Sequence, residues 1–262
     1  MSPGTLDLNA DCGESYGNWQ LGSDEILDHV TSANVAAGFH AGDPVTLVAT
    51  VEAAVERGVG VGVHPGLPDL LGFGRRRMDI SPEDAYAYFV YQAGAVAAAL
   101  RRHGATLHHV KPHGAMYLIL RDNEDLAEAA TRAICEVMDE PVLYWPDLTE
   151  WAHLPRLARA AGVRVLTEIY PDLSYDADGG LVVERAKHST PVDAARERVR
   201  AYLEDGVVRA LDGSLLPIQA ESICVHGDGP NAIEVVQAVR EECEKQGVRL
   251  SSTIEPQEGG QG

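Results

Sequence analysis

The 262-residue chain lacks several features by which common classes of protein are recognised. No apolar run is long enough to cross a bilayer, and the first residues have neither the basic nor the apolar segment of a signal peptide. The four cysteines form no CxxC pair and no zinc-ligand spacing, so free thiols are expected. These absences predict a cytoplasmic protein with no membrane span. The cysteines are Cys12, Cys135, Cys224 and Cys243.

Positive charge is also scarce. The chain has 21 Lys and Arg against 40 Asp and Glu, which gives a formal net charge of −19. This balance argues against binding to nucleic acid or to an anionic membrane. There is no GxxxxGK[ST], no GxGxxG after a strand, no HExxH and no GxSxG. Any ATP used by the protein should therefore be bound by another polypeptide.

Segments with strand signals alternate with segments that carry helix caps, early prolines and glycine stops. We expect helices over 43–58, 81–104, 122–138, 149–162, 190–206 and 230–247, with Pro155 kinking or breaking the fourth. We expect strands over 5–10, 32–37, 59–63, 106–110, 141–145, 163–168 and 222–225, a weak one over 248–251, and a hairpin within 207–218.

Repeated βα units of this kind predict an α/β protein with a mostly parallel sheet. The sheet is either closed as a barrel or open and doubly wound, and we favour a parallel (β/α) barrel of about seven strands. It should occupy residues 1–251 as a single domain. The polar, glycine-rich residues 252–262 should form a disordered tail.

Polar side chains alternate with aliphatic ones along the expected strands. In the first strand, Leu6 and Leu8 alternate with Asp7, Asn9 and Asp11. One face of each strand therefore suits packing under helices, and the other places polar groups inside the barrel. In such barrels catalytic groups gather at the carboxyl ends of the strands. Those ends offer Asp11, His40, His64, His113, Glu168 and His226.

Each of these residues also has a purely structural interpretation. A lone histidine after a strand is often only hydrogen-bonded, but four at equivalent places favour a shared site. For Asp11 the structural alternative to catalysis is a role as an anchor at the floor of the barrel. Lys111 needs an anionic partner if it is buried. Arg75 belongs to a run of three arginines that either faces solvent or binds a carboxylate or phosphate. Cys12 and Cys224 fit small core positions better than nucleophiles.

Six stretches resemble the LamB/YcsF family, and together they span about nine-tenths of the chain. The stretches are 7–17 (DLNADCGESYG), 32–44 (SANVAAGFHAGDP), 62–78 (GVHPGLPDLLGFGRRRM), 91–95 (YQAGA), 109–117 (HVKPHGAMY) and 222–228 (SICVHGD). The resemblance implies a distorted barrel related to the polysaccharide deacetylase-like fold. It also implies ATP-dependent opening of the 5-oxoproline lactam to glutamate, by a 5-oxoprolinase that needs partner subunits B and C. ATP would then be bound through those partners.

A lactam is a poor electrophile, so the reaction needs an activated ring oxygen, a deprotonated water and a stabilised oxyanion. Asp11 suits the role of base, and His64, Lys111 and His113 suit the electrophilic role. The expected substrate-binding residues are Asn9, His40, Arg75, Glu168 and His226.

The sequence departs from the family pattern at three informative positions. Leu173 replaces an arginine, Ala37 a cysteine and Leu118 an asparagine. An arginine at 173 would pair with the substrate carboxylate. Its loss implies either that another arginine, from the run 75–77, takes over this role, or that the substrate is a lactam with an apolar substituent, and we favour the second because Trp145 and Leu118 add apolar bulk near the strand ends. The structural alternative is that the family arginine only braces a loop.

Two alternatives remain open at this point. One is a metal-dependent amide hydrolase or deacetylase that holds a divalent cation with Asp11, His40 and His64. The other is a non-catalytic scaffold subunit that only binds partners.

Overall fold

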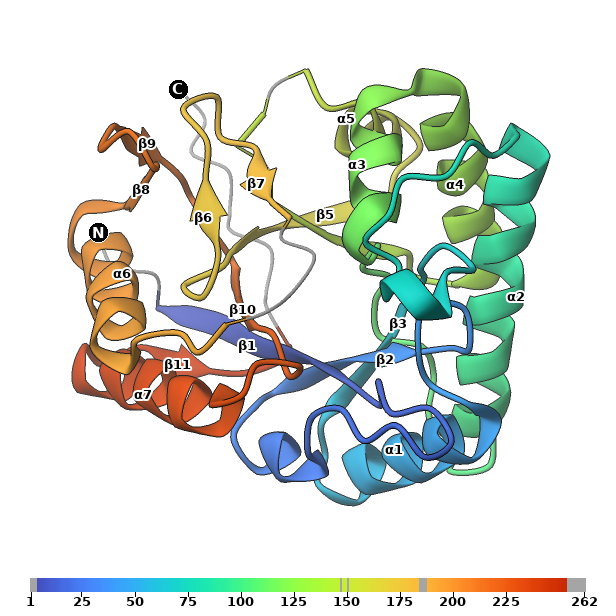
Figure 1. Ribbon diagram of the computed structural model, residues 1–262, viewed down its shortest axis with the longest axis horizontal. Coiled ribbons are helices and arrows are strands. Elements are labelled where there is room, and N and C mark those ends of the chain that lie inside the picture. Colours follow the sequence, from blue (N-terminus) through green and yellow to red (C-terminus); the bar gives the residue numbers. More distant parts are fainter. Residues whose placement is uncertain (1–3, 147, 150, 184–187, 254–262) are drawn as a thin grey trace.

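The computed structural model describes residues 4–146, 148–149, 151–183 and 188–253. Its central sheet is parallel, with strands in the order β3-β2-β1-β10-β5-β4, and β11 pairs with the start of β1. Helices surround this curved sheet (Figure 1). The strands are β1 (Thr5–Cys12), β2 (Ser32–Ala36), β3 (Gly60–His64), β4 (Val142–Trp145), β5 (Arg164–Ile169), β10 (Ser222–Val225) and β11 (Arg249–Leu250). The predicted α/β class and distorted parallel barrel are confirmed.

The segment 106–110 differs from the strand that its sequence predicts. Only Val110 forms bridges, one to Val63 in β3 and one to Leu143 in β4. Its backbone N–H donates to Val142 O at 2.9 Å, and its carbonyl accepts from Tyr144 N at 2.9 Å. Pro112 lacks the N–H that would continue such a ladder. The segment is therefore irregular, but it links the two edge strands of the sheet.

Helices cover the outer face of the sheet. Figure 1 shows α2 and α4 on one side, α6 and α7 on the opposite side, and α1 below. Five predicted helices are confirmed: α1 (Pro44–Glu56), α2 (Pro82–Arg101), α4 (Glu124–Val137), α6 (Val192–Asp205) and α7 (Ala232–Lys245). The Asp43 side chain caps α1, and Ser81 with Asp84 forms a capping box on α2.

Two helical segments differ from expectation. The helix α5 (His153–Ala160) begins later than predicted, so Pro155 lies in its first turn and does not break it. The helix α3 (Gly114–Asp122) was not predicted, because His113 precedes it without a side-chain capping bond. Two short 3₁₀ helices, η1 (Asp24–Asp28) and η2 (Leu70–Gly72), were not predicted either.

Two small antiparallel hairpins lie outside the main sheet. The predicted hairpin within 207–218 is confirmed as β8 (Val207–Arg209) and β9 (Leu215–Pro217). A second hairpin, β6 (Ser174–Tyr175) and β7 (Leu181–Val182), was not predicted. Of the expected disordered tail, residues 254–262 lie outside the described residues.

Both faces of β1 are buried, but they meet different surroundings. Leu6 and Leu8 belong to the hydrophobic core. Asp7 accepts hydrogen bonds from Ser32 Oγ at 2.5 Å and from the Tyr144 hydroxyl at 2.8 Å, so it anchors the barrel floor. Burial raises the pKa of Asp7 above its usual value.

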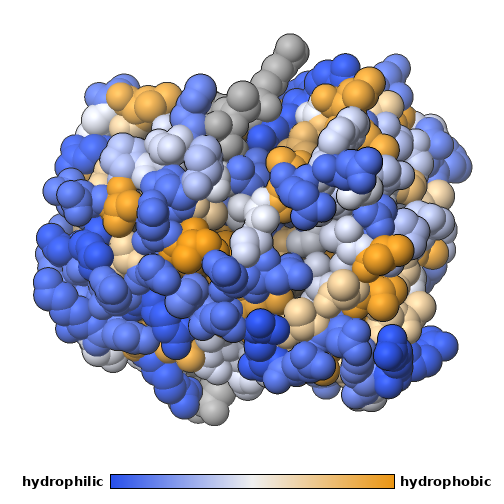
Figure 2. Space-filling view, turned by 60° about the horizontal axis from the view of Figure 1, so that its bottom comes forward, coloured by the Kyte–Doolittle hydropathy of each residue, from blue (hydrophilic) through white to orange (hydrophobic). Residues whose placement is uncertain are grey.

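The face of the molecule in Figure 2 is largely hydrophilic, with hydrophobic side chains in small separate groups. No helix of the described chain is long and apolar enough to cross a membrane.

Candidate functional site

The carboxyl ends of the strands surround a narrow cleft. Six predicted site residues from five separate segments line it. They are Asp11, His64, Arg75, Lys111, His113 and His226. The remaining predicted residues do not line this cleft: Asn9 and Glu168 are bonded to one another, and His40 is stacked on His113.

Lys111 is a buried cation between two carboxylates. Its Nζ lies 3.1 Å from Glu168 Oε1 and 3.4 Å from Asp11 Oδ1, and it also contacts the Cys224 sulfur. Burial alone would lower the pKa of Lys111, but Asp11, Cys224 and Glu168 outweigh burial and raise it well above its usual value. Lys111 therefore carries a positive charge beside the cleft, and it suits stabilisation of a developing oxyanion rather than nucleophilic attack.

Asp11 is buried at the end of β1 and stays ionised. Burial alone would raise its pKa, but His64, Lys111 and His226 outweigh burial and hold it well below its usual value. The Asn34 side chain donates a hydrogen bond to Oδ1 at 2.8 Å. A carboxylate of such low pKa is a weak base, although it can still orient a water molecule or a neighbouring imidazole.

His226 forms a dyad with Asp172, a residue that the strand-end pattern did not reveal. His226 Nδ1 lies 3.0 Å from Asp172 Oδ2 and donates to that carboxylate. The other ring nitrogen, Nε2, lies 3.7 Å from Asp11 Oδ2. The carboxylate on Nδ1 fixes the tautomer in which Nε2 accepts a proton, and it stabilises the resulting imidazolium.

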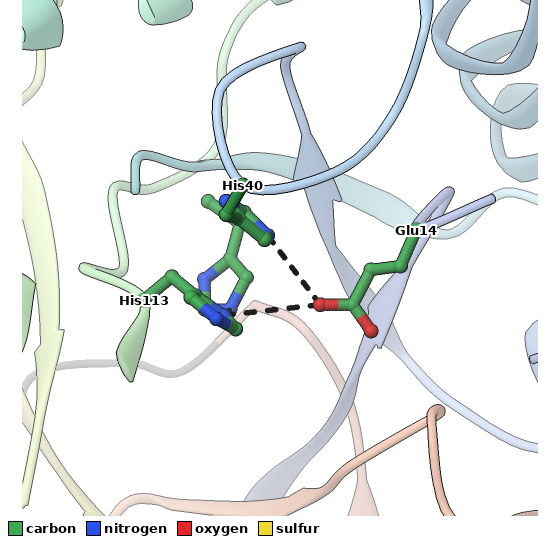
Figure 3. Close-up of side chains that lie close together, drawn as sticks. Glu14, His40 and His113 are labelled. Carbon is green, nitrogen blue, oxygen red and sulfur yellow. Dashed lines mark hydrogen bonds and ion pairs between the residues drawn. The ribbon is translucent and has the colours of Figure 1, made fainter. Parts of the chain in front are cut away.

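Three histidines and one glutamate converge beside the cleft. His64 Nε2 lies 2.9 Å from His113 Nδ1. Figure 3 shows His40 and His113 beside Glu14, whose Oε1 is 3.4 Å from His40 Nε2 and 3.8 Å from His113 Nδ1. The His40 and His113 rings are stacked, with centroids 3.7 Å apart. Burial is the main cause that lowers the pKa of both His40 and His113 well below the usual value.

Glycines allow this close packing of rings. Gly74 has φ +64°, and a Cβ there would lie 2.6 Å from His40 Cβ and 2.8 Å from His113 Cδ2. A Cβ at Gly66 would overlap the His40 ring. Larger residues at either position would displace the imidazoles.

The arginine run is engaged in ion pairs with aspartates. Arg75 is largely buried and pairs with Asp228 at 2.6 Å, so its guanidinium is already matched by a carboxylate. The neighbouring arginines Arg76 and Arg77 pair with Asp69 and Asp122.

The three departures from the family pattern lie in different surroundings. Leu173 lines the cleft, beside Trp145, Leu181 and Val183. Ala37 and Leu118 instead pack in or against the hydrophobic core and are not among the residues lining the cleft. The expectation that Leu118 adds apolar bulk to the site is therefore wrong, because its side chain contributes to the packing of α3.

Comparison with known proteins identifies the family and the fold of the chain. The model of the LamB/YcsF family matches residues 6–258. The A subunit of 5-oxoprolinase from Bordetella pertussis is 44% identical over 255 residues, which are 96% of this chain and 100% of that protein. The crystal structure of a lactam utilization protein from Thermus thermophilus has a TM-score of 0.85 at 41% identity, and the match covers 95% of this chain and 100% of that one.

A more distant structure shares the fold alone. A putative cellobiose-phosphate cleavage protein from Enterococcus faecalis has a TM-score of 0.60 at 14% identity, and the match covers 95% of this chain and 97% of that one. The predicted likeness to the polysaccharide deacetylase-like fold is confirmed at this level.

Proposed function

This chain belongs to the LamB/YcsF family, and from that premise we propose that it is the lactam-binding subunit of an ATP-dependent lactam-cleaving enzyme resembling 5-oxoprolinase. The observation that carries the proposal is the buried Lys111 cation, which lies beside Asp11 and lines the same cleft as His226. The names of its relatives, the A subunit of a 5-oxoprolinase and a lactam utilization protein, support the same substrate class.

The 5-oxoprolinase reaction, which serves as the model, converts 5-oxoproline, ATP and two water molecules to glutamate, ADP and phosphate. Transfer of the γ-phosphate to the lactam oxygen makes the ring carbon attackable by water. The C–N bond then breaks as the ring nitrogen takes up a proton, which leaves an acyl phosphate, and a second water hydrolyses this to glutamate and phosphate. We assign ATP binding to the partner subunits B and C, because this chain has no phosphate-binding loop and a net charge of −19. ATP is a cytoplasmic cosubstrate, so we place the assembly in the cytoplasm.

The residues of this chain supply the hydrolytic half of the reaction. We assign to Asp11 the orientation of the attacking water, to His226 the acceptance of its proton, and to Lys111 the stabilisation of the oxyanion. Asp172 is a positioning residue that acts through His226. Asn9 and Glu168 lie beneath Lys111 and hold its ammonium group.

The test is reconstitution of the purified chain with subunits B and C, ATP and a lactam. We expect ring opening that Asp11→Asn and Lys111→Met each lower by about 100-fold or more, with folding checked by circular dichroism. Lys245→Met, at an exposed position, is the control. Normal turnover by both site variants would contradict the proposal and favour a scaffold role.

A second candidate function is ATP-independent amide hydrolysis with a bound metal. The cluster of Glu14, His40, His64 and His113 favours it, because imidazole and carboxylate groups are the ligands of catalytic zinc. Lactam or N-acetyl hydrolysis by the chain without ATP or partners would support this candidate over the first.

A further inference from the structure

The hydrogen bonds of two histidines leave their other ring nitrogens facing one another. His64 Nδ1 lies 2.7 Å from the carbonyl oxygen of Lys111, and His113 Nε2 lies 2.7 Å from that of Phe73. A carbonyl oxygen can only accept, so both of these nitrogens carry the proton of their ring. In the neutral rings, His64 Nε2 and His113 Nδ1 therefore point their lone pairs at one another, and the two nitrogens are only 2.9 Å apart.

Two carboxylates add further electron pairs to the same small space. Asp11 Oδ2 lies 3.3 Å from His64 Nε2, and Glu14 Oε1 lies 3.8 Å from His113 Nδ1. All four of these side chains are buried, so little solvent screens the repulsion. Such an arrangement is stable only with a cation among the lone pairs, either a shared proton or a metal ion.

We propose that Glu14, His64 and His113 form a binding site for one divalent transition-metal ion of the zinc type. Bonds of about 2.0–2.2 Å in a tetrahedral arrangement place neighbouring ligand atoms roughly 3.3–3.6 Å apart. The separations of 2.9 Å and 3.8 Å lie on either side of that range. Two imidazoles and one carboxylate are a ligand set of catalytic zinc sites, which keep a fourth position open.

The surroundings of the cluster match those of a metal site. Histidine ligands of metals usually donate their second ring N–H to a carbonyl or carboxylate, as His64 and His113 do. His40 places a further ring N–H next to the cluster. Both its ring nitrogens are buried without a hydrogen bond, and Nε2 lies 3.4 Å from Glu14 Oε1. We assign to His40 the task of holding the Glu14 carboxylate and, by stacking, the plane of the His113 ring.

Metal binding by the isolated full-length chain tests this proposal without any assay of turnover. The untagged protein is stripped with a chelator and titrated with Co²⁺, whose visible absorption reports its coordination. We expect one Co²⁺ per chain, the absorption of a four- or five-coordinate site, displacement by Zn²⁺, and a higher melting temperature with either ion.

Variants locate the site within the chain. Glu14→Gln keeps the shape of the side chain but removes its charge, and we expect it to weaken Co²⁺ binding about 100-fold or more, beyond the effect of losing a supporting residue. His188→Ala, at an exposed position, should bind as the wild type does. His113→Ala provides a second ligand variant in case Glu14→Gln fails to fold.

Absence of stoichiometric binding by the wild type would overturn the proposal and identify a proton as the shared cation. Unchanged binding by both ligand variants would overturn it as well. Failure of lactam turnover in the reconstituted enzyme contradicts only the proposed function, because the titration uses neither ATP nor lactam.

Discussion

His226 depends on one carboxylate for its proposed role. Asp172→Asn keeps the size of the side chain, but it removes the charge that stabilises the imidazolium and allows the other tautomer. We expect kcat of the reconstituted enzyme to fall about 100-fold or more, with KM for the lactam nearly unchanged and the pH profile altered.

Asp178→Asn, at an exposed position near β6, is the matched control and should leave both constants unchanged. A loss of stability in Asp172→Asn without a change in the pH profile would mean that Asp172 only braces the loop after β5.

Leu173 tests substrate choice at the scale of a single side chain. It lines the cleft with Trp145, and Arg75 is already paired with Asp228, so no nearby arginine of the 75–77 run is left to bind a substrate carboxylate. We expect the wild type to prefer lactams with an apolar substituent. Leu173→Arg should raise kcat/KM for 5-oxoproline by roughly 10–100-fold, the effect of about 1.5–3 kcal/mol from a charge-assisted hydrogen bond.

Leu173→Met, which keeps an apolar side chain of similar volume, is the control for packing. If 5-oxoproline is the best substrate of the wild type and the arginine variant gains nothing, the hypothesis that Leu173 changes the substrate preference is wrong.

The sequence reveals those site residues that follow a regular pattern. Period-two alternation along β1 places Asn9 and Asp11 on the inner face, and the histidines that end strands or begin loops lie where the barrel rule expects them. The same alternation in β2 would have identified Asn34. Glu14 and Asp172 lie in loops, whose conformation depends on tertiary contacts, so no local period indicates where their side chains point.

At the scale of elements, caps and glycine stops predict the long helices well because their signals are local. The helix α3 lacks such a signal at its start. It begins directly after His113, whose ring contacts that of His64. The hairpin of β6 and β7 has two residues in each strand, too few to show a period. Pairing of the 106–110 segment with both edge strands is a tertiary property, which explains why a predicted strand became isolated bridges.

The contact between α6 and α7 predicts a pH effect on stability. Glu242 in α7 is fully buried and accepts two hydrogen bonds from Arg200 in α6, at 2.8 and 3.1 Å. The hydrogen bond from Arg200 is the main cause that lowers the pKa of Glu242 from 4.5 to about 2. Its ionised form is therefore favoured by folding, and the stabilisation is present above pH 4.5 and is lost as the pH falls toward 2.

We expect Glu242→Gln to lower the free energy of unfolding at pH 7, and the difference from the wild type to shrink between pH 4.5 and 2. Urea unfolding across this range measures it. Glu241→Gln, which removes an exposed partner of Arg196, should show a much smaller difference at every pH. A constant difference for Glu242→Gln would show that the loss is one of packing.

At the scale of the whole molecule, the parallel arrangement makes the site predictable as a region. Every strand of a parallel sheet ends at the same edge, so residues far apart in the sequence, such as Asp11 and His226, meet without any local signal. The chemistry within that region follows from contacts that only the folded chain creates. The orientation of His64 and His113 by two carbonyl groups is an example.

The charge of the molecule as a whole predicts how ATP enters the reaction. A triphosphate needs several cations or a loop of backbone N–H groups, yet the chain has a net charge of −19 and no phosphate-binding loop. Near the cleft, Arg75, Arg76 and Arg77 are each paired with an aspartate, and Lys111 is held between two carboxylates.

We therefore expect no ATP hydrolysis by the chain alone. With subunits B and C and a lactam present, we expect ADP and ring-opened product to appear in equal amounts. Subunits B and C without this chain are the control for uncoupled hydrolysis. Robust ATPase activity of the isolated chain would contradict the assignment of ATP to its partners, and it would direct attention to the groups at the cleft mouth.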